Sequence, residues 1–228
     1  MSGPGSEGAG RPTLAIIGGT GALGSGLARR WLAAGYGVII GSRSADKAQA
    51  AARTLASASH GAKAHGAANT DAAAAGDIVM LAVPWASHAE ILDEIKPHVA
   101  GKIVIDATVP LAPPKVARVQ LPAETSAALA AQKRLGETAR VVAAFHNVAA
   151  RKLQTDAPID CDVLVFADAP EDRAAVIALA ESAGLRGIHA GPLANAVAAE
   201  ALVSVLIGIN RHYKVPGAGI RITGLGRD

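Results

Sequence analysis

A glycine-rich turn between an apolar strand and a helix is the feature that most constrains this chain. The apolar run at residues 13–17 predicts a buried strand, residues 23–34 predict a helix, and Gly19-Thr20-Gly21-Ala22-Leu23-Gly24 joins them. In such a G-x-G-x-x-G turn the first glycine permits the tight bend, the second lets the backbone approach a pyrophosphate, and the third lets the helix pack closely on the strand. Because the helix N-terminus adds free N–H groups and partial positive charge, the turn predicts a dinucleotide-binding site.

The end of the second predicted strand distinguishes NADP from NAD. Residues 36–40 are followed by Gly41-Ser42-Arg43, about 20 residues beyond the glycines, where an NAD site has an acidic residue on the ribose 2′-hydroxyl. No acid stands there. Ser42, Arg43 and Lys47 could instead surround a 2′-phosphate, with a planar fork from Arg and a point charge from Lys. The alternative is that both cations are solvated charges, although cations at a helix start oppose the helix dipole. We predict a preference for NADP.

Strands and helices alternate along most of the chain, which predicts an α/β fold with a Rossmann-type doubly wound parallel sheet and a small C-terminal α/β lobe. We expect a disordered N-terminal extension over residues 1–12, a nucleotide-binding domain over 13–150, and the lobe over 151–228. The predicted strands are 13–17, 36–40, 62–66, 77–83, 102–106, 140–144, 163–166 and 185–190, and the predicted helices are 23–34, 45–59, 69–75, 87–96, 171–183 and 193–213.

Composition and spacing argue against several classes of protein. The net charge of +3 on 228 residues comes from cations without runs of like charge, which favours an anionic small molecule over nucleic acid. The histidines and the cysteine have no metal-ligand spacing, and no serine or cysteine lies in a nucleophile motif. We also expect no signal peptide and no membrane span. The single cysteine, Cys161, fits a reducing cytoplasm, and its position at a strand start favours a small buried hydrophobe over a reactive thiol.

Two segments depart from the simple alternation. The proline-rich stretch 107–122 is long for a connection in a compact domain; such loops are functional or disordered, and we favour an active-site loop because it begins at a strand's carboxyl end. The final predicted helix, 193–213, is apolar almost all round. A helix of this kind is buried in a core or against another subunit, and we therefore expect a homodimer.

Three strand ends carry the remaining candidates: Val83-Pro84-Trp85, Thr108-Val109-Pro110 and Phe145-His146-Asn147. In doubly wound sheets ligands bind at the carboxyl ends of the strands, so these segments should converge where a nicotinamide lies. Trp85 could wall the cofactor or simply pack near a helix start. His146 could donate a hydrogen bond to the nicotinamide amide or to the second substrate, or it could be a structural residue. The residues alone leave both questions open.

The motifs taken together resemble the NADPH-dependent reductases of the 5-deazaflavin coenzyme F420, from about residue 13 to the C-terminus. Their order and spacing carry the resemblance. They are Gly-Gly-Thr-Gly-Ala-Leu-Gly at 18–24, Gly-Ser-Arg at 41–43 with Lys47, Val-Pro-Trp at 83–85, Phe-His-Asn-Val-Ala-Ala at 145–150, Asp-Cys-Asp at 160–162, Ala-Gly-Pro-Leu at 190–193 and Lys-Val-Pro-Gly-Ala-Gly-Ile at 214–220.

This resemblance implies reversible hydride transfer between C4 of the nicotinamide and C5 of the deazaflavin, with the C-terminal lobe completing the deazaflavin site and the dimer contacts. With the fingerprint glycines included, the implied NADP-binding residues are Gly19, Thr20, Gly21, Ala22, Leu23, Gly24, Ser42, Arg43, Lys47, Trp85, Val109 and Ala150. The implied acceptor-binding residues are Pro84, His146, Asn147, Pro192, Leu193, Ala218 and Gly219.

Hydride transfer between two stacked rings needs orientation more than it needs side-chain chemistry. The missing acid/base pair is consistent with such a reaction, and no residue is assigned as catalytic beyond His146 as a candidate orienting donor. The glycine-rich tail 216–219 could let a flat ring approach the backbone, or it could only pack the C-terminus. Two other functions stay open: an NADPH-dependent reductase of an imine, a carbonyl compound or a pterin, and a non-catalytic NADP-sensing module.

Overall fold

Six parallel strands form the main sheet of the computed structural model, which describes residues 10–59 and 63–226. Residues 1–9 of the expected N-terminal extension lie outside the described residues. The order β3-β2-β1-β4-β5-β6 is that of a doubly wound Rossmann sheet, so the predicted fold class is confirmed. The strands are β1 (Leu14–Ile17), β2 (Val38–Ser42), β3 (Ala64–Ala68), β4 (Ile78–Leu81), β5 (Ile103–Asp106) and β6 (Arg140–Ala143).

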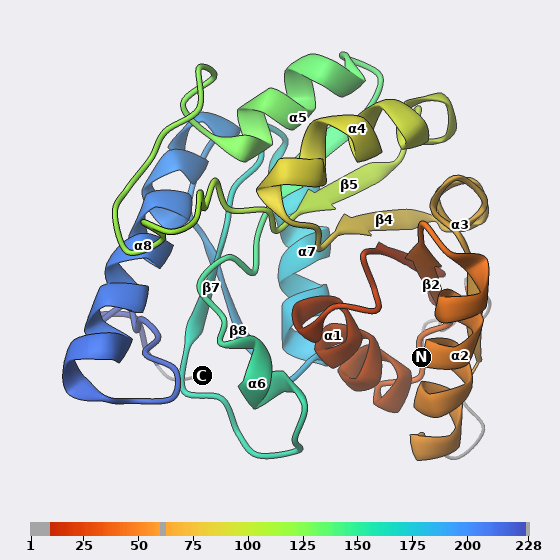
Figure 1. Ribbon diagram of the computed structural model, residues 1–228, viewed down its shortest axis with the longest axis horizontal. Helices are drawn as coiled ribbons and strands as arrows, with labels where there is room; N and C mark the ends of the chain where they lie inside the picture. The colour runs from red at the N-terminus through yellow and green to blue at the C-terminus, as the bar shows by residue number, and fades with distance from the viewer. Residues whose placement is uncertain (1–9, 60–62, 227–228) are drawn as a thin grey trace, which may run out of the picture.

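Apolar residues on both faces of the sheet build two cores. Leu14 and Ile16 of β1 face one core, and Ala15 and Ile17 face the other, because successive side chains of a strand point to opposite faces. Figure 1 shows α1 and α2 on one side of the sheet and α4 and α5 on the other. The first core includes residues of α1 (Ala22–Ala33), α2 (Ala45–Ala58) and α7 (Pro170–Ser182), and the second those of α3 (Asn69–Ala75), α4 (Trp85–Ile95) and α5 (Ala127–Leu135).

Helices α4 and α5 differ from the expectation. Helix α4 begins at Trp85, two residues before the expected start, because its first turn follows Pro84 directly. Helix α5 lies in a stretch for which no element was expected. Its start is capped by the Ser126 hydroxyl, which accepts the Leu129 N–H at 3.1 Å, and it ends at Gly136 with φ 89°. Both are ordinary helix signals that the preceding proline-rich loop obscured.

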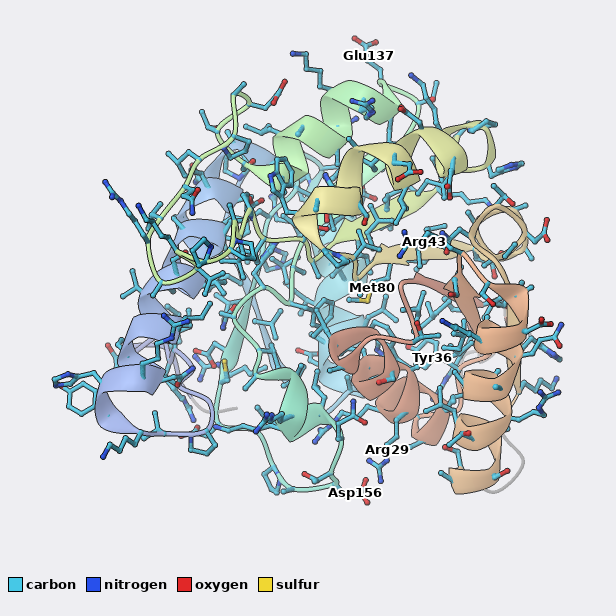
Figure 2. The ribbon with its side chains drawn as sticks, viewed as in Figure 1. Arg29, Tyr36, Arg43, Met80, Glu137 and Asp156 are labelled. Carbon is cyan, nitrogen blue, oxygen red and sulfur yellow. The ribbon has the colours of Figure 1, made fainter. Side chains whose placement is uncertain are left out.

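The C-terminal segment is joined to the sheet by backbone and side-chain contacts. A small parallel pair, β7 (Asp162–Val165) and β8 (Arg186–His189), lies beside β6, and Ala143 and Phe166 exchange two backbone hydrogen bonds of 2.9 and 3.0 Å. Arg29 of α1 also pairs with Asp156, just after α6 (Ala150–Leu153), at 2.7 Å (Figure 2). The segment therefore packs against the first half of the chain through both α1 and β6.

The last helix is only partly buried. A 3-10 turn at Leu193–Asn195 leads into α8 (Ala196–Tyr213). One side of α8 packs against the rest of the protein. On the other side, the side chains of Val205, Ile209 and Tyr213 are 48%, 36% and 69% exposed. We expected no segment suited to a membrane span, but Leu193–Tyr213 is long and apolar enough by length and composition alone, with a mean hydropathy of 1.7 and a third of its residues buried.

Candidate functional site

The glycine turn follows β1 and leads directly into α1. Gly18 has φ 79°, and a Cβ there would lie 2.5 Å from the carbonyl oxygen of Ala82, so the turn runs against the end of β4. A Cβ on Gly24 would lie 2.8 Å from the Cα of Gly19. These contacts require glycine at both positions, and they leave the N-terminus of α1 open beside the turn, where backbone N–H groups can bind phosphate.

A cavity of about 190 Å³ lies over this turn. The structure brings five of the predicted site residues to its wall: Thr20, Gly21, Ser42, Arg43 and Pro84. The other lining residues are Gly18, Asn69, Ala82, Val83, Ser87 and Ile91. Because these residues come from the carboxyl ends of β1, β2 and β4 and from the starts of α3 and α4, the cavity lies where a doubly wound sheet binds its ligand.

The ribose end of the cavity is cationic. Arg43 (labelled in Figure 2) and Lys47 are exposed and stand at the start of α2, whose N-cap Ser44 accepts the Lys47 N–H at 3.4 Å. Ser42 accepts the Ser44 N–H at 3.3 Å. Among residues 10–59 and 63–226, no carboxylate lies within 4 Å of the charged nitrogens of Arg43 or Lys47. Both charges are therefore available to an anion. Lys47 lies outside the cavity wall itself.

Asn69 is a candidate that sequence reasoning missed. It is the first residue of α3, 4% exposed, and lines the cavity. Its Nδ2 lies 3.4 Å from Glu94 Oε2, and its Oδ1 has no partner in the described part of the chain. A buried polar atom without a partner carries a free-energy cost, which a ligand can relieve. Its position at the carboxyl end of β3 was the available signal.

Trp85, Val109 and Ala150 do not line this cavity. Trp85 lies instead on a groove of about 390 Å³ between α4 and α5, with its ring 5.3 Å from that of His88. Val109 faces a small gap against α8, and Ala150 begins α6. The interpretation of Trp85 as a wall of the nucleotide cavity therefore has no support from its position here.

His146 follows β6 and is 7% exposed. Neither ring nitrogen has a partner among the described residues. Burial lowers the pKa of His146 to about 4, against the opposing effect of Asp106, so the ring is neutral near pH 7. A neutral imidazole offers one N–H donor and one acceptor, which suits orientation of a ligand and not general acid catalysis.

Asn147, Ala218 and Gly219 do not line the cavity over the glycine turn. Asn147 donates from Nδ2 to the Asp162 carbonyl at 2.8 Å and lies 3.1 Å from Cys161 Sγ. A Cβ on Gly219 would lie 2.7 Å from that sulfur, and Ala218 N–H is bound by Asn210 Oδ1 at 2.6 Å. The thiol is buried and its pKa is raised by burial, so the prediction of a small buried residue is confirmed.

Pro192 and Leu193 begin the last helical segment, where Pro192 is exposed and Leu193 is 1% exposed. The Leu193 N–H is bound by Asp168 Oδ1 at 3.1 Å. Neither residue reaches the cavity over the glycine turn. Across the described residues no group of three or more His, Cys, Asp or Glu side chains is placed to hold a metal.

The sheet order and the glycine turn together define a Rossmann-type fold, and its cavity has an exposed cation, Arg43, in its wall. A family model described as NADP oxidoreductase, coenzyme F420-dependent, matches residues 13–110. Two curated F420-dependent NADP reductases, from Methanothermobacter thermautotrophicus and Methanocaldococcus jannaschii, are each 41% identical over 93% of this chain, and the matches span 95% and 98% of their own lengths.

A crystal structure of a candidate F420-dependent NADP reductase from Arthrobacter sp. FB24 has a TM-score of 0.78 at 25% identity, and the match covers 93% of this chain and 100% of that one. The chain belongs to the family of coenzyme F420-dependent NADP oxidoreductases. The predicted family is therefore confirmed.

Proposed function

We propose that this protein transfers a hydride reversibly between C4 of NADP(H) and C5 of the deazaflavin coenzyme F420. The observation that carries the proposal is the cavity over the glycine turn, which places Ser42 and Arg43 beside the N-terminus of α1 in a chain of this family. A pyrophosphate fits the helix N-terminus, and a 2′-phosphate fits the guanidinium fork.

For NADP we assign the backbone of Gly19, Thr20, Gly21, Ala22, Leu23 and Gly24 to the pyrophosphate, and Ser42, Arg43 and Lys47 to the 2′-phosphate. Trp85, Val109 and Ala150 are assigned to the nicotinamide end, outside the cavity wall. Because two of these three residues line other grooves, the assignment requires the nicotinamide to extend past Pro84 toward the ends of β5 and β6.

For the acceptor we assign Pro84, His146, Asn147, Pro192, Leu193, Ala218 and Gly219 to the ring site that residues 151–228 complete. When both are bound, the nicotinamide and the deazaflavin supply the hydride donor and acceptor. The residues of the chain hold the rings with the reacting carbons about 3–3.5 Å apart and exclude water. His146 orients one ring through its single N–H, since its pKa of about 4 keeps it neutral.

The activity is tested by mixing the purified protein with NADPH and oxidised F420. We expect the visible absorption of the deazaflavin to bleach, and reduced F420 with NADP⁺ to restore it. Absence of bleaching in a protein that still binds NADPH would contradict the proposal. The same preparation with no F420 binding would instead support the NADP-sensing module.

We further propose that the protein is a cytoplasmic homodimer in which α8 packs against a second copy. The support is the exposed apolar side of α8, with Val205 and Ile209 48% and 36% exposed. Burial of the exposed part of each of these side chains contributes about 0.5–1.5 kcal/mol. Sedimentation should give a dimer for the wild type and a monomer for the double variant V205D/I209D, and a monomeric wild type would exclude the dimer.

A further inference from the structure

A buried His–Asp pair joins α4 to β5 at the carboxyl edge of the sheet. His88 Nε2 lies 2.7 Å from Asp106 Oδ2, and the two side chains are 1% and 0% exposed. In every other ion pair among residues 10–59 and 63–226, at least one side chain is 27% exposed or more. Desolvation makes such a pair costly, and apolar side chains of similar volume are often at least as stable. Stability alone therefore does not account for it.

The pair connects two turns that carry assigned nicotinamide residues. His88 lies in the first turn of α4, three residues after Trp85, and the two rings are 5.3 Å apart at 33°. Asp106 is the last residue of β5, and its second oxygen accepts the Thr108 N–H at 2.9 Å. One carboxylate thus fixes both the start of α4 and the turn that leads to Val109.

The carboxylate is ionised in this setting. Burial raises the pKa of Asp106, but the charge of His88 and the hydrogen bonds from His88 and Thr108 outweigh it, so the pKa lies below its usual value. Both carboxylate oxygens accept hydrogen bonds from donors of the chain, so Asp106 is already bound to both of the segments that it joins. Its role must therefore be exerted through the segments that it joins.

We propose that His88 and Asp106 are positioning residues that hold Trp85 and the Thr108–Val109 turn in fixed relation at the nicotinamide end. The inference rests on the proposed function. Displacement of either turn misaligns the hydride donor, and a misplacement of about 1 Å can cost about 100-fold in rate. The 2′-phosphate end is held by other elements, so the affinity for NADPH depends little on the pair.

The test is single-turnover reduction of F420 by NADPH, with the transferred hydrogen either protium or deuterium. For H88A we expect hydride transfer to slow by about 10- to 100-fold, a larger primary isotope effect on turnover, and a change of less than about threefold in the Kd of NADPH. H88Q keeps an N–H near the position of Nε2, and it should recover at least half of the lost rate on a logarithmic scale.

The matched control is D172N, which weakens another pair with a buried carboxylate, from Arg140 Nη1 to Asp172 Oδ1 at 2.8 Å, at the amino end of β6 and therefore away from the strand ends that carry the site. It should leave the hydride rate unchanged. If H88A does not fold, D106N replaces it, and this variant should slow transfer by about threefold or more, since it removes the charge and keeps the shape.

Two outcomes would overturn the inference. The first is an H88A rate equal to that of D172N, and the second is a loss of NADPH affinity that accounts for the whole loss of rate. A wild type that binds NADPH and reduces no F420 would refute the proposed function, and with it the positioning role. A wild type that reduces F420 beside an unimpaired H88A would refute the positioning role alone.

Discussion

Glu200 makes the stability of this protein depend on pH in a direction opposite to that of an ordinary surface carboxylate. The side chain is 2% exposed on α8, and its oxygens accept the N–H groups of Ala127 and Ala128 at 2.6 and 3.1 Å, at the start of α5. Burial raises its pKa to about 8, against the effect of those two hydrogen bonds, and the charge of Asp106 raises it further.

The sign follows from proton binding. Between about pH 4.5 and 8 the folded protein keeps a proton on Glu200 that the unfolded chain releases, so the free energy of unfolding falls as the pH rises through this window. A shift from 4.5 to about 8 corresponds to at most about 5 kcal/mol, at about 1.4 kcal/mol per pKa unit. Glutamine keeps one acceptor and cannot ionise, so E200Q removes this dependence.

The measurement is urea denaturation of the wild type and E200Q at pH 5 and pH 8. The difference in unfolding free energy between the two proteins should shift in favour of E200Q by about 2–4 kcal/mol from pH 5 to pH 8, because one proton over three pH units contributes at most about 4 kcal/mol. Any constant cost of the substitution cancels in this comparison. The control E124Q removes an accessible carboxylate near α5 and should give no such shift. If the helix N-terminus keeps Glu200 ionised, E200Q is destabilised equally at both pH values and the reasoning is refuted.

Three further predictions concern the nucleotide and His146. R43E should raise the Kd of NADPH by about 100-fold, because the charge-assisted hydrogen bonds of the guanidinium to the 2′-phosphate are lost. Fluorescence titration should show the Kd of NADH nearly unchanged, and an unchanged NADPH affinity would remove the argument for the 2′-phosphate site. N69A should weaken NADPH binding by about 5- to 10-fold if its amide contacts the ligand, whereas an effect on unfolding alone would assign it a structural role. The pKa of His146 is lowered from 6.5 to about 4, so the free energy of unfolding falls by at most about 3 kcal/mol as the pH drops from 6.5 to 4. H146Q should remove this loss in acid denaturation, and an equal loss in the variant would contradict the prediction.

Most of the main sheet could be predicted from sequence because its strands other than β3 are short, mostly apolar runs; β3 (Ala64–Ala68) has a weak pattern and begins two residues after the predicted start. The run at β1 and the glycine turn after it are adjacent in the chain, so local signals were enough. Helix α5 was missed because its cap signals at Ser126 and Gly136 follow a proline-rich loop. Which side of α8 stays exposed could not be predicted, since an apolar helix gives no indication of which side the fold covers.

The site could be predicted only in part. Ser42 and Arg43 were predicted because a hydroxyl and a cation stand where an NAD site has an acid, and the structure places both on the cavity wall. The contact of His88 with Asp106 joins residues that are 18 positions apart and lie on different elements. No periodicity in the sequence indicates that these two side chains meet. Asn69 was missed for a related reason, because its significance comes from an unpaired Oδ1, which is a property of the packing and not of the sequence.

The ties between α1 and the C-terminal segment limit how the molecule can move. Besides the pairing of Arg29 with Asp156, the guanidinium of Arg30 donates to the carbonyl oxygens of Thr155, Ala157 and Ala183 at 2.7, 2.9 and 2.9 Å. A hinge motion that opened residues 13–150 away from 151–228 would break these bonds together. These contacts therefore tie α1, whose N-terminus we assign to the pyrophosphate, to the segment assigned to the acceptor. Access and release of the two ligands then depend on local rearrangement of side chains and loops.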